Sequence, residues 1–203
     1  MRVVITSPLL LPHAIYQAML AHARAQYPNE ACGLLRGRAG RVIEFLPAQN
    51  VSPTPRTDYE VDAATLLRAL DWEDEGDELI AIFHSHPVSP AYPSMVDVAK
   101  ATYPDSVYLI LSLQRPTDPE LKGYRLQPEV ILHGEEAASL RTQLPFIQVR
   151  PGLWGFRLAT SEKTSNFREM VARPEADMYL VYDHPQGPIR LVAIHPVEIL
   201  LQF

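Results

Sequence analysis

The sequence predicts an α/β fold, in which helices pack on a β-sheet and a small β-rich unit follows. Apolar runs bounded by turns alternate with segments of helical spacing. Two of these runs, residues 78–86 and 107–113, are apolar almost throughout, which is typical of strands buried on both faces. After residue 135, three apolar stretches separated by polar loops replace this alternation. The sequence therefore predicts one α/β domain followed by a small β-rich unit.

Local patterns define the elements before residue 60. Residues 2–6, RVVIT, are rich in β-branched side chains and predict a strand. Residues 31–37 and 41–48 predict a β-hairpin, because both arms are apolar and glycines lie between them. Residues 13–26 predict an amphipathic helix, since apolar side chains recur there at helical spacing: Ile15, Met19, Leu20 and Ala23.

The next segments complete the first unit. Asp62 is expected to cap a helix that runs to about Asp71, with apolar positions at Ala64, Leu66, Leu67 and Leu70. The strand ELIAIFHSH follows, and a proline-rich loop leads to a short helix in SMVDVAKATYP. VYLILSL predicts another buried strand, and ELKGYRLQ and PEVILHG predict the last two strands of this unit.

The final third of the chain differs in character. We expect a first domain at residues 1–135 and a small β-rich C-terminal unit of unknown role at residues 136–203. A linking helix is predicted at 135–144, with strands in PGLWGFRLAT, DMYLVYD and IRLVAIHPVEILLQF. A unit this small is marginal for an independent core, so we expect it to pack on the first domain or on a second chain. A homodimer stays open.

The composition of the chain indicates which binding partners and which cellular compartment to expect. The net charge of -6 disfavours partnership with nucleic acid or an anionic membrane surface. The chain contains one cysteine, Cys32, so no internal disulfide supports the fold. The sequence has neither a run of about 18 apolar residues nor a clear signal-peptide pattern. We therefore expect a soluble cytoplasmic protein.

Two histidines at the end of an apolar strand carry the strongest chemical signal. His84 and His86 are separated by one residue, so their side chains project from the same face of the strand. Such a pair can bind one Zn²⁺, and Asp97 in the following helix is the natural third ligand if the proline-rich loop folds back over the strand end. Two other interpretations stay open at this point. Ser94 and Asp97 fit a helix-capping box, and the histidines fit ordinary polar side chains at a strand end.

The whole string, taken with an acid far upstream, resembles the JAMM (MPN+) metalloprotease family. The chain has Glu30, then His84-Ser85-His86-Pro87, and then Ser94-Met95-Val96-Asp97. Seven residues separate His86 from Ser94, which is the usual gap in that family. The resemblance extends over roughly residues 1–133 and includes YPNEACGLLRG around the glutamate. It implies the mixed, cytidine-deaminase-like β-sheet flanked by helices that is typical of the family.

The resemblance also implies a role for each motif residue. His84, His86 and Asp97 would bind one Zn²⁺ per chain, with water in the fourth position. Glu30 would act as the general base on that water and return the proton to the departing amine. Ser94 would help to stabilise the oxyanion. Cys32 is interpreted as a buried structural thiol, and a redox or metal-binding role is the alternative.

The function implied is that of a zinc metallopeptidase or isopeptidase, similar to a deubiquitinase. By resemblance, it would hydrolyse an amide bond after the C-terminal glycines of a ubiquitin-like or sulfur-carrier protein. One alternative is a catalytically inactive MPN-type scaffold or protein-binding module. Another is the related group linked to DNA repair, which the acidic charge disfavours.

Overall fold

The computed structural model describes residues 7–158 and 177–203, and these divide into two compact units. The first comprises residues 7–92, 105–124 and 196–203. The second comprises residues 93–104 and the described parts of 125–195. The proposed division of the chain into domains 1–135 and 136–203 stays a prediction, because compactness alone does not test independent folding.

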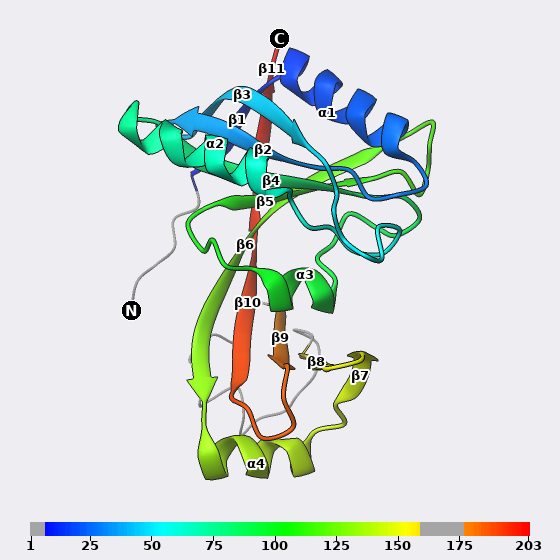
Figure 1. Ribbon diagram of the computed structural model, residues 1–203, viewed down its shortest axis with the longest axis vertical. Coiled ribbons are helices and arrows are strands. Elements are labelled where there is room, and N and C mark those ends of the chain that lie inside the picture. The colour runs from blue at the N-terminus through cyan, green and yellow to red at the C-terminus, as the bar shows by residue number, and fades with distance from the viewer. Residues whose placement is uncertain (1–6, 159–176) are drawn as a thin grey trace. The chain divides into compact units, whose positions relative to one another are not determined.

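The first unit is an α/β arrangement with a mixed sheet (Figure 1). Its strand order is β11-β1-β3-β2-β4-β5-β6. β4 pairs in parallel with β5 and antiparallel with β2, and β1 pairs in parallel with β11. The elements are β1 (Leu9–Pro12), α1 (His13–Gln26), β2 (Cys32–Arg38), β3 (Arg41–Ala48), α2 (Ala63–Asp74), β4 (Glu78–His86), β5 (Val107–Ser112), β6 (Glu120–Leu132) and β11 (Ile199–Gln202).

Helix α1 covers one face of this sheet. Met19, Leu20 and Ala23 are buried together with Phe83 of β4 and Leu109 of β5 in one hydrophobic cluster. The buried positions of α1 are among those predicted from its helical spacing. Because neighbouring residues in a strand point to opposite faces, the side chains on either side of Phe83 point away from α1.

The second unit has its own core. Its strands follow the order β10-β9-β8-β7. Leu140 of α4 and Leu158 are buried in a cluster with Met178 and Leu180. Trp154 and Phe156 pack against this cluster as partly buried side chains. The elements are α3 (Met95–Lys100), α4 (Gly134–Gln143), β7 (Ile147–Arg150), β8 (Leu153–Leu158), β9 (Asp177–Tyr182) and β10 (Ile189–Val197).

Several predicted elements need correction. Helix α2 starts after Asp62 as expected, but Leu67 and Leu70 are 63% and 67% exposed. The helix instead buries Thr65, Ala69 and Trp72, because Trp72 presents the larger apolar surface. The two strands predicted across 120–134 are one strand, β6. Pro128 removes a single N–H donor and is compatible with extended backbone, so β6 continues through it.

The prediction for the first residues is not tested, and the one for the last residues needs correction. The predicted strand at residues 2–6 lies outside the described residues. The stretch IRLVAIHPVEILLQF forms two strands, β10 and β11, and the second pairs Ile199 with Leu9 of β1. The last residues therefore belong to the first unit.

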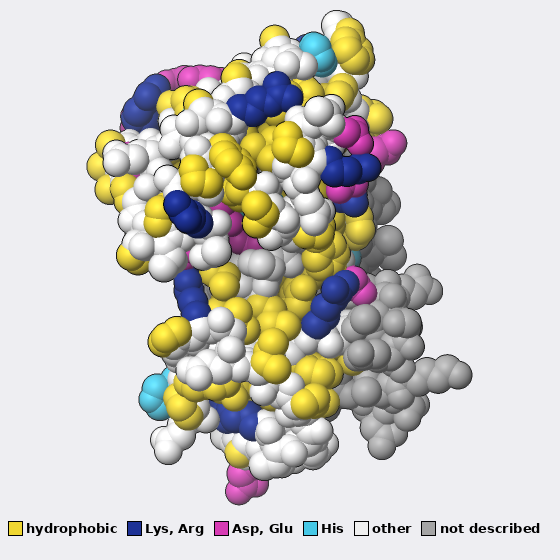
Figure 2. Space-filling view, turned by 90° about the vertical axis from the view of Figure 1, so that its right-hand side faces the viewer, with side chains coloured by type: hydrophobic (Ala, Val, Ile, Leu, Met, Phe, Trp, Pro, Cys, Tyr) yellow, Lys and Arg dark blue, Asp and Glu magenta, His cyan; other side chains and the backbone are white. Residues whose placement is uncertain are grey.

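The surface shows no concentration of positive charge on the face drawn in Figure 2. There the Lys and Arg side chains of the described residues lie at separate points, several of them beside Asp or Glu side chains. Within the described parts of the chain, no helix is long and apolar enough to cross a membrane.

Candidate metal centre and active site

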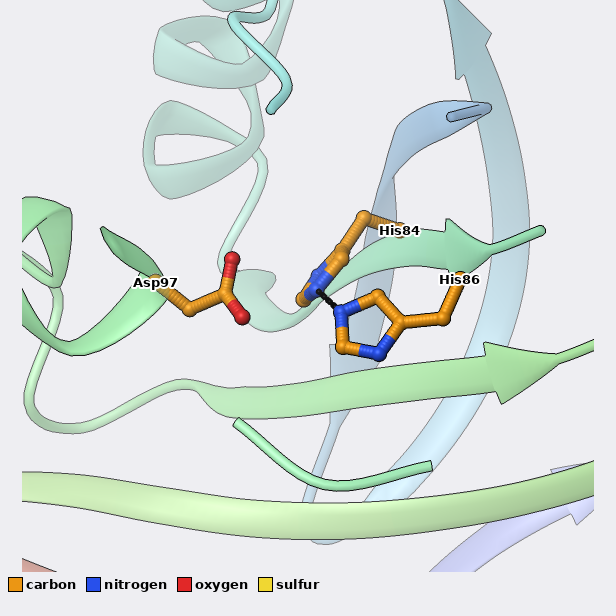
Figure 3. Close-up of side chains that lie close together, drawn as sticks. All are labelled: His84, His86 and Asp97. Atoms are coloured by element: carbon orange, nitrogen blue, oxygen red, sulfur yellow. Dashed lines mark hydrogen bonds between the residues drawn. The ribbon is translucent and has the colours of Figure 1, made fainter. Parts of the chain in front are cut away.

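His84 and His86 occupy the last positions of β4, on the face that points away from α1. Strand pairing fixes them on both sides, because His84 lies opposite Cys32 of β2 and beside Ile110 of β5. Their Nε2 atoms lie 3.1 Å apart, and the rings converge as Figure 3 shows. Two nitrogens bound to one tetrahedral zinc at about 2.0–2.1 Å would lie roughly 3.3 Å apart. The pair is therefore arranged as two ligands of one ion would be.

The position of one hydrogen on His86 follows from the contact of its Nδ1 atom. His86 Nδ1 lies 2.7 Å from the carbonyl oxygen of Pro90. A carbonyl can only accept a hydrogen bond, so Nδ1 carries a hydrogen, and in the neutral ring the lone pair then lies on Nε2. Metal-binding histidines are commonly oriented by such a contact at the second nitrogen. The proline-rich loop after β4 thus favours the tautomer whose lone pair lies on Nε2, which is the nitrogen that faces His84.

Ser94 and Asp97 form a capping box at the start of α3. Asp97 N donates to Ser94 Oγ over 3.1 Å, and Ser94 N donates to Asp97 Oδ2 over 2.6 Å. The capping interpretation from sequence is therefore confirmed. It does not exclude a second role, because a serine hydroxyl that accepts one hydrogen bond can still donate its own hydrogen. A carboxylate likewise has a second oxygen.

The structure brings the three predicted ligands together. His84, His86 and Asp97 each offer a ligand atom within 4.8 Å of the others (Figure 3). All three are buried, with exposed fractions of 0%, 4% and 5%. Two imidazole nitrogens and one carboxylate oxygen make a donor set that suits zinc, and three protein ligands leave a fourth position for chemistry. These residues therefore fit a catalytic zinc ion.

Glu30 lies two residues before Cys32, the first residue of β2, in a segment bound to the histidine-bearing end of β4. The neighbouring residue Ala31 receives a hydrogen bond at its carbonyl from Ser85 N, over 2.9 Å. Ala31 N in turn donates to Ser85 Oγ over 2.8 Å. Ser85 is the residue between the two histidines. The backbone beside Glu30 is therefore fixed to the predicted metal-binding pair, and Glu30 itself is buried.

Cys32 is fully buried beside this region. Burial, with smaller contributions from the charges of Asp62 and Glu30, raises the pKa of the Cys32 thiol to about 12. A thiol with such a pKa stays protonated near neutral pH, and redox chemistry needs the thiolate. The environment therefore favours the structural interpretation of Cys32 over the redox one.

Two further residues next to the site were not identified from sequence. The ring of Tyr59 stacks on His84, with centroids 4.4 Å apart and planes 17° apart. Asn50 donates from its side chain to the carbonyl oxygen of Glu30 over 2.9 Å. Neither residue belongs to a periodic pattern, because both lie in or next to the irregular segment between β3 and α2. No signal in a single sequence marks them.

The fold and site together define a class of protein: an α/β domain with a His-His-Asp cluster at the end of a central strand and a buried glutamate nearby. The chain belongs to the family of prokaryotic homologs of the JAB domain, whose model matches residues 12–126. The resemblance to the JAMM (MPN+) group is thereby confirmed. The match ends within β6, so most of the second unit lies beyond it.

Individual relatives agree with this assignment. The CysO-cysteine peptidase of Mycobacterium tuberculosis is 38% identical over 121 residues, which are 58% of this chain and 82% of the relative. A desampylase of Haloferax volcanii is 37% identical over 116 residues, covering 53% of this chain and 82% of the relative. A protein of Desulfitobacterium hafniense with a known solution structure is 38% identical, with a TM-score of 0.51, over 57% of this chain and 82% of that one.

Proposed function

We propose that the chain is a zinc-dependent peptidase and isopeptidase. It would hydrolyse the amide bond that follows the C-terminal glycines of a ubiquitin-like or sulfur-carrier protein. The convergence of His84, His86 and Asp97, with His86 held as a metal-ready tautomer, is the observation that carries this proposal. The relatives support the reaction class, since they are named as a peptidase and a desampylase. The chain is thus an enzyme of the JAMM hydrolase type.

The roles of the chain's own residues follow from their chemistry. His84, His86 and Asp97 would hold the zinc, which when bound would activate water and polarise the scissile carbonyl. Glu30 would accept a proton from the attacking water and pass it to the departing amine. Its burial supports this role, because a carboxylate shielded from solvent exchanges its proton with a bound partner and not with bulk water.

Ser94 would donate a hydrogen bond to the oxyanion that develops on the carbonyl. Its hydroxyl is held in place by Asp97 N, so the donor is oriented before substrate binds. Preorganised donors of this kind stabilise a transition state more than flexible ones do. The capping box would therefore align a proposed metal ligand and a proposed oxyanion donor through the same contacts.

The glycine requirement of the substrate has a physical basis. A peptide that passes close to a buried metal site needs residues without a Cβ, so that the backbone can approach the ligands closely. The M. tuberculosis relative is named a CysO-cysteine peptidase, so a carrier protein joined to cysteine is the first substrate to test. An isopeptide bond to a lysine side chain is the second.

The test uses carrier proteins that end in Gly-Gly, joined either to cysteine through a peptide bond or to a lysine Nζ through an isopeptide bond. A matched substrate replaces the last glycine with valine. The wild-type protein is expected to bind one zinc per chain and to cleave at least one of the Gly-Gly substrates, but not the valine one. Glu30→Gln is expected to keep the zinc and lose about 10²–10⁴-fold in kcat.

The matched control is Glu78→Gln, an exposed acid at the opposite end of β4, which is expected to behave as wild type. Equal cleavage by wild type and Glu30→Gln would overturn the proposed role of Glu30. A wild-type protein that neither binds zinc nor cleaves would favour a non-catalytic scaffold instead.

A further inference from the structure

The side-chain amide of Asn50 forms four hydrogen bonds beside the site. Nδ2 donates to the carbonyl oxygens of Glu30 and Asp58, over 2.9 and 3.0 Å. Oδ1 accepts from the backbone N–H groups of Ser52 and Glu60, over 3.0 and 3.1 Å. The orientation of the amide is unambiguous, because both partners of Nδ2 are carbonyls and both partners of Oδ1 are N–H donors. Two donor hydrogens and two acceptor positions are thus all used.

Two hydrogen bonds hold the main chain of Glu30, one at its N–H group and one at its carbonyl group. The Glu30 N–H donates to the carbonyl oxygen of Pro55 over 2.7 Å, while the Glu30 carbonyl accepts from Asn50. Both partners belong to the segment between β3 and α2. The position of the proposed general base therefore depends on how this segment is folded, and the Asn50 amide joins Glu30 to three of its residues, Ser52, Asp58 and Glu60.

The same segment carries Tyr59 to His84. Tyr59 lies between Asp58 and Glu60, and the main chain of each of these neighbours is bonded to the Asn50 amide. Its ring stacks on the imidazole of His84 with centroids 4.4 Å apart. Such stacking restricts rotation of the imidazole plane, and that plane determines where the ring nitrogens point.

We propose that Asn50 is a positioning residue of the active site, whose one amide fixes the main chain of Glu30 and the loop that places the Tyr59 ring on His84. The proposal rests on the proposed function. It goes beyond that function because it links the proton-handling residue and a proposed metal ligand through one side chain. A residue that only stabilised a turn would change the free energy of unfolding and leave zinc affinity and kcat unaltered.

The Tyr59 arm of the test measures zinc affinity by competition with a chelator. Tyr59→Leu removes the ring and is expected to weaken zinc binding about 10–100-fold, the usual effect of losing an outer-shell contact. Tyr59→Phe keeps the ring and is expected to restore affinity to within about threefold of wild type. Equal zinc affinity of the Leu and Phe variants would contradict the positioning role of the ring.

The Asn50 arm measures kcat and KM at saturating zinc, zinc affinity, and thermal unfolding. Asn50→Ala removes all four contacts and is expected to lower kcat at least about tenfold with little change in KM, and also to weaken zinc binding. Asn50→Asp keeps the acceptor for Ser52 and Glu60 but loses both donors, so it is a second variant if the alanine variant does not fold. The control is Gln17→Ala, which removes an exposed amide of α1 that contacts His13.

The outcomes separate this proposal from the proposed function. If wild type binds zinc and cleaves, but folded Asn50 variants match it in kcat and zinc affinity, the positioning role is wrong and the function stands. If wild type binds zinc without cleaving, the function is wrong, and zinc affinity of the Asn50 and Tyr59 variants still decides the positioning role. A wild-type protein without zinc affinity overturns both.

Discussion

Ser94 and Asp97 cap each other across the first turn of α3, and each is also a proposed active-site residue. The Ser94 hydroxyl accepts from Asp97 N, and Asp97 Oδ2 accepts from Ser94 N. A structural and a catalytic interpretation of the motif are therefore compatible. They can be separated by experiment, because a cap affects stability and an oxyanion donor affects rate.

Two substitutions of Ser94 separate the roles. Ser94→Ala is expected to lower the free energy of unfolding by about 1 kcal/mol, whereas Ser94→Gly costs only a few tenths (about 0.3 kcal/mol), since glycine is tolerated at an N-cap. Both lack the hydroxyl, so both are expected to lose about 10²–10³-fold in kcat. Chemical denaturation and steady-state kinetics measure the two effects. Normal kcat in a stable Ser94→Gly variant would remove Ser94 from the mechanism.

Asp77, the residue before β4, is bound to two arginines of β2. Its carboxylate accepts from Arg36 Nε over 2.6 Å and from Arg38 Nε over 2.7 Å, and its side chain is 1% exposed. Burial acts to raise the pKa of Asp77, but hydrogen bonds and charges from the two arginines outweigh it and hold the pKa below its usual range.

This lowered pKa predicts a pH-dependent stability. The stabilisation is present above the unfolded-state pKa of about 3.9 and is lost as the pH falls through the lower folded-state value. Wild type should therefore lose more free energy of unfolding than Asp77→Asn between about pH 5 and pH 2. Denaturation series at several pH values measure this difference. Asp118→Asn, at an exposed ion pair with Arg115, is the control. Parallel pH profiles for wild type and Asp77→Asn would contradict the prediction.

Cys32 is expected to be structural. Cys32→Ala should keep one zinc per chain and wild-type cleavage, and should lower the free energy of unfolding by about 1–2 kcal/mol because a buried side chain is shortened. Zinc analysis, kinetics and denaturation measure these three properties. Loss of zinc from a folded Cys32→Ala variant would show that the thiol serves the metal after all.

Elements whose pattern is unambiguous were predicted well from sequence. The spacing of Met19, Leu20 and Ala23 identified α1, and the continuous apolar run before His84 identified β4. Helix α2 was predicted with the wrong buried face, because its leucines and its tryptophan lie on different sides. Only contacts with the sheet decide between them, and those contacts bury Trp72.

Prediction of the site from sequence is limited in the same way. His84, His86 and Asp97 were predicted from a motif whose members are close in sequence, and the structure brings them together. The contacts of Asn50 with Glu30 and of Tyr59 with His84 join residues far apart in the chain. They depend on how an irregular loop folds, which no local spacing encodes.

X-ray absorption spectroscopy of the zinc-loaded protein tests the central claim most directly, because it identifies the atoms around the metal. The wild-type protein is expected to contain one zinc per chain, surrounded only by nitrogen and oxygen at about 2.0–2.1 Å. His86→Ala and Asp97→Ala are expected to lose the zinc, whereas His133→Ala, at an exposed position before α4, should keep it. A wild-type protein without zinc, or a sulfur neighbour at about 2.3 Å, would contradict a His84-His86-Asp97 centre.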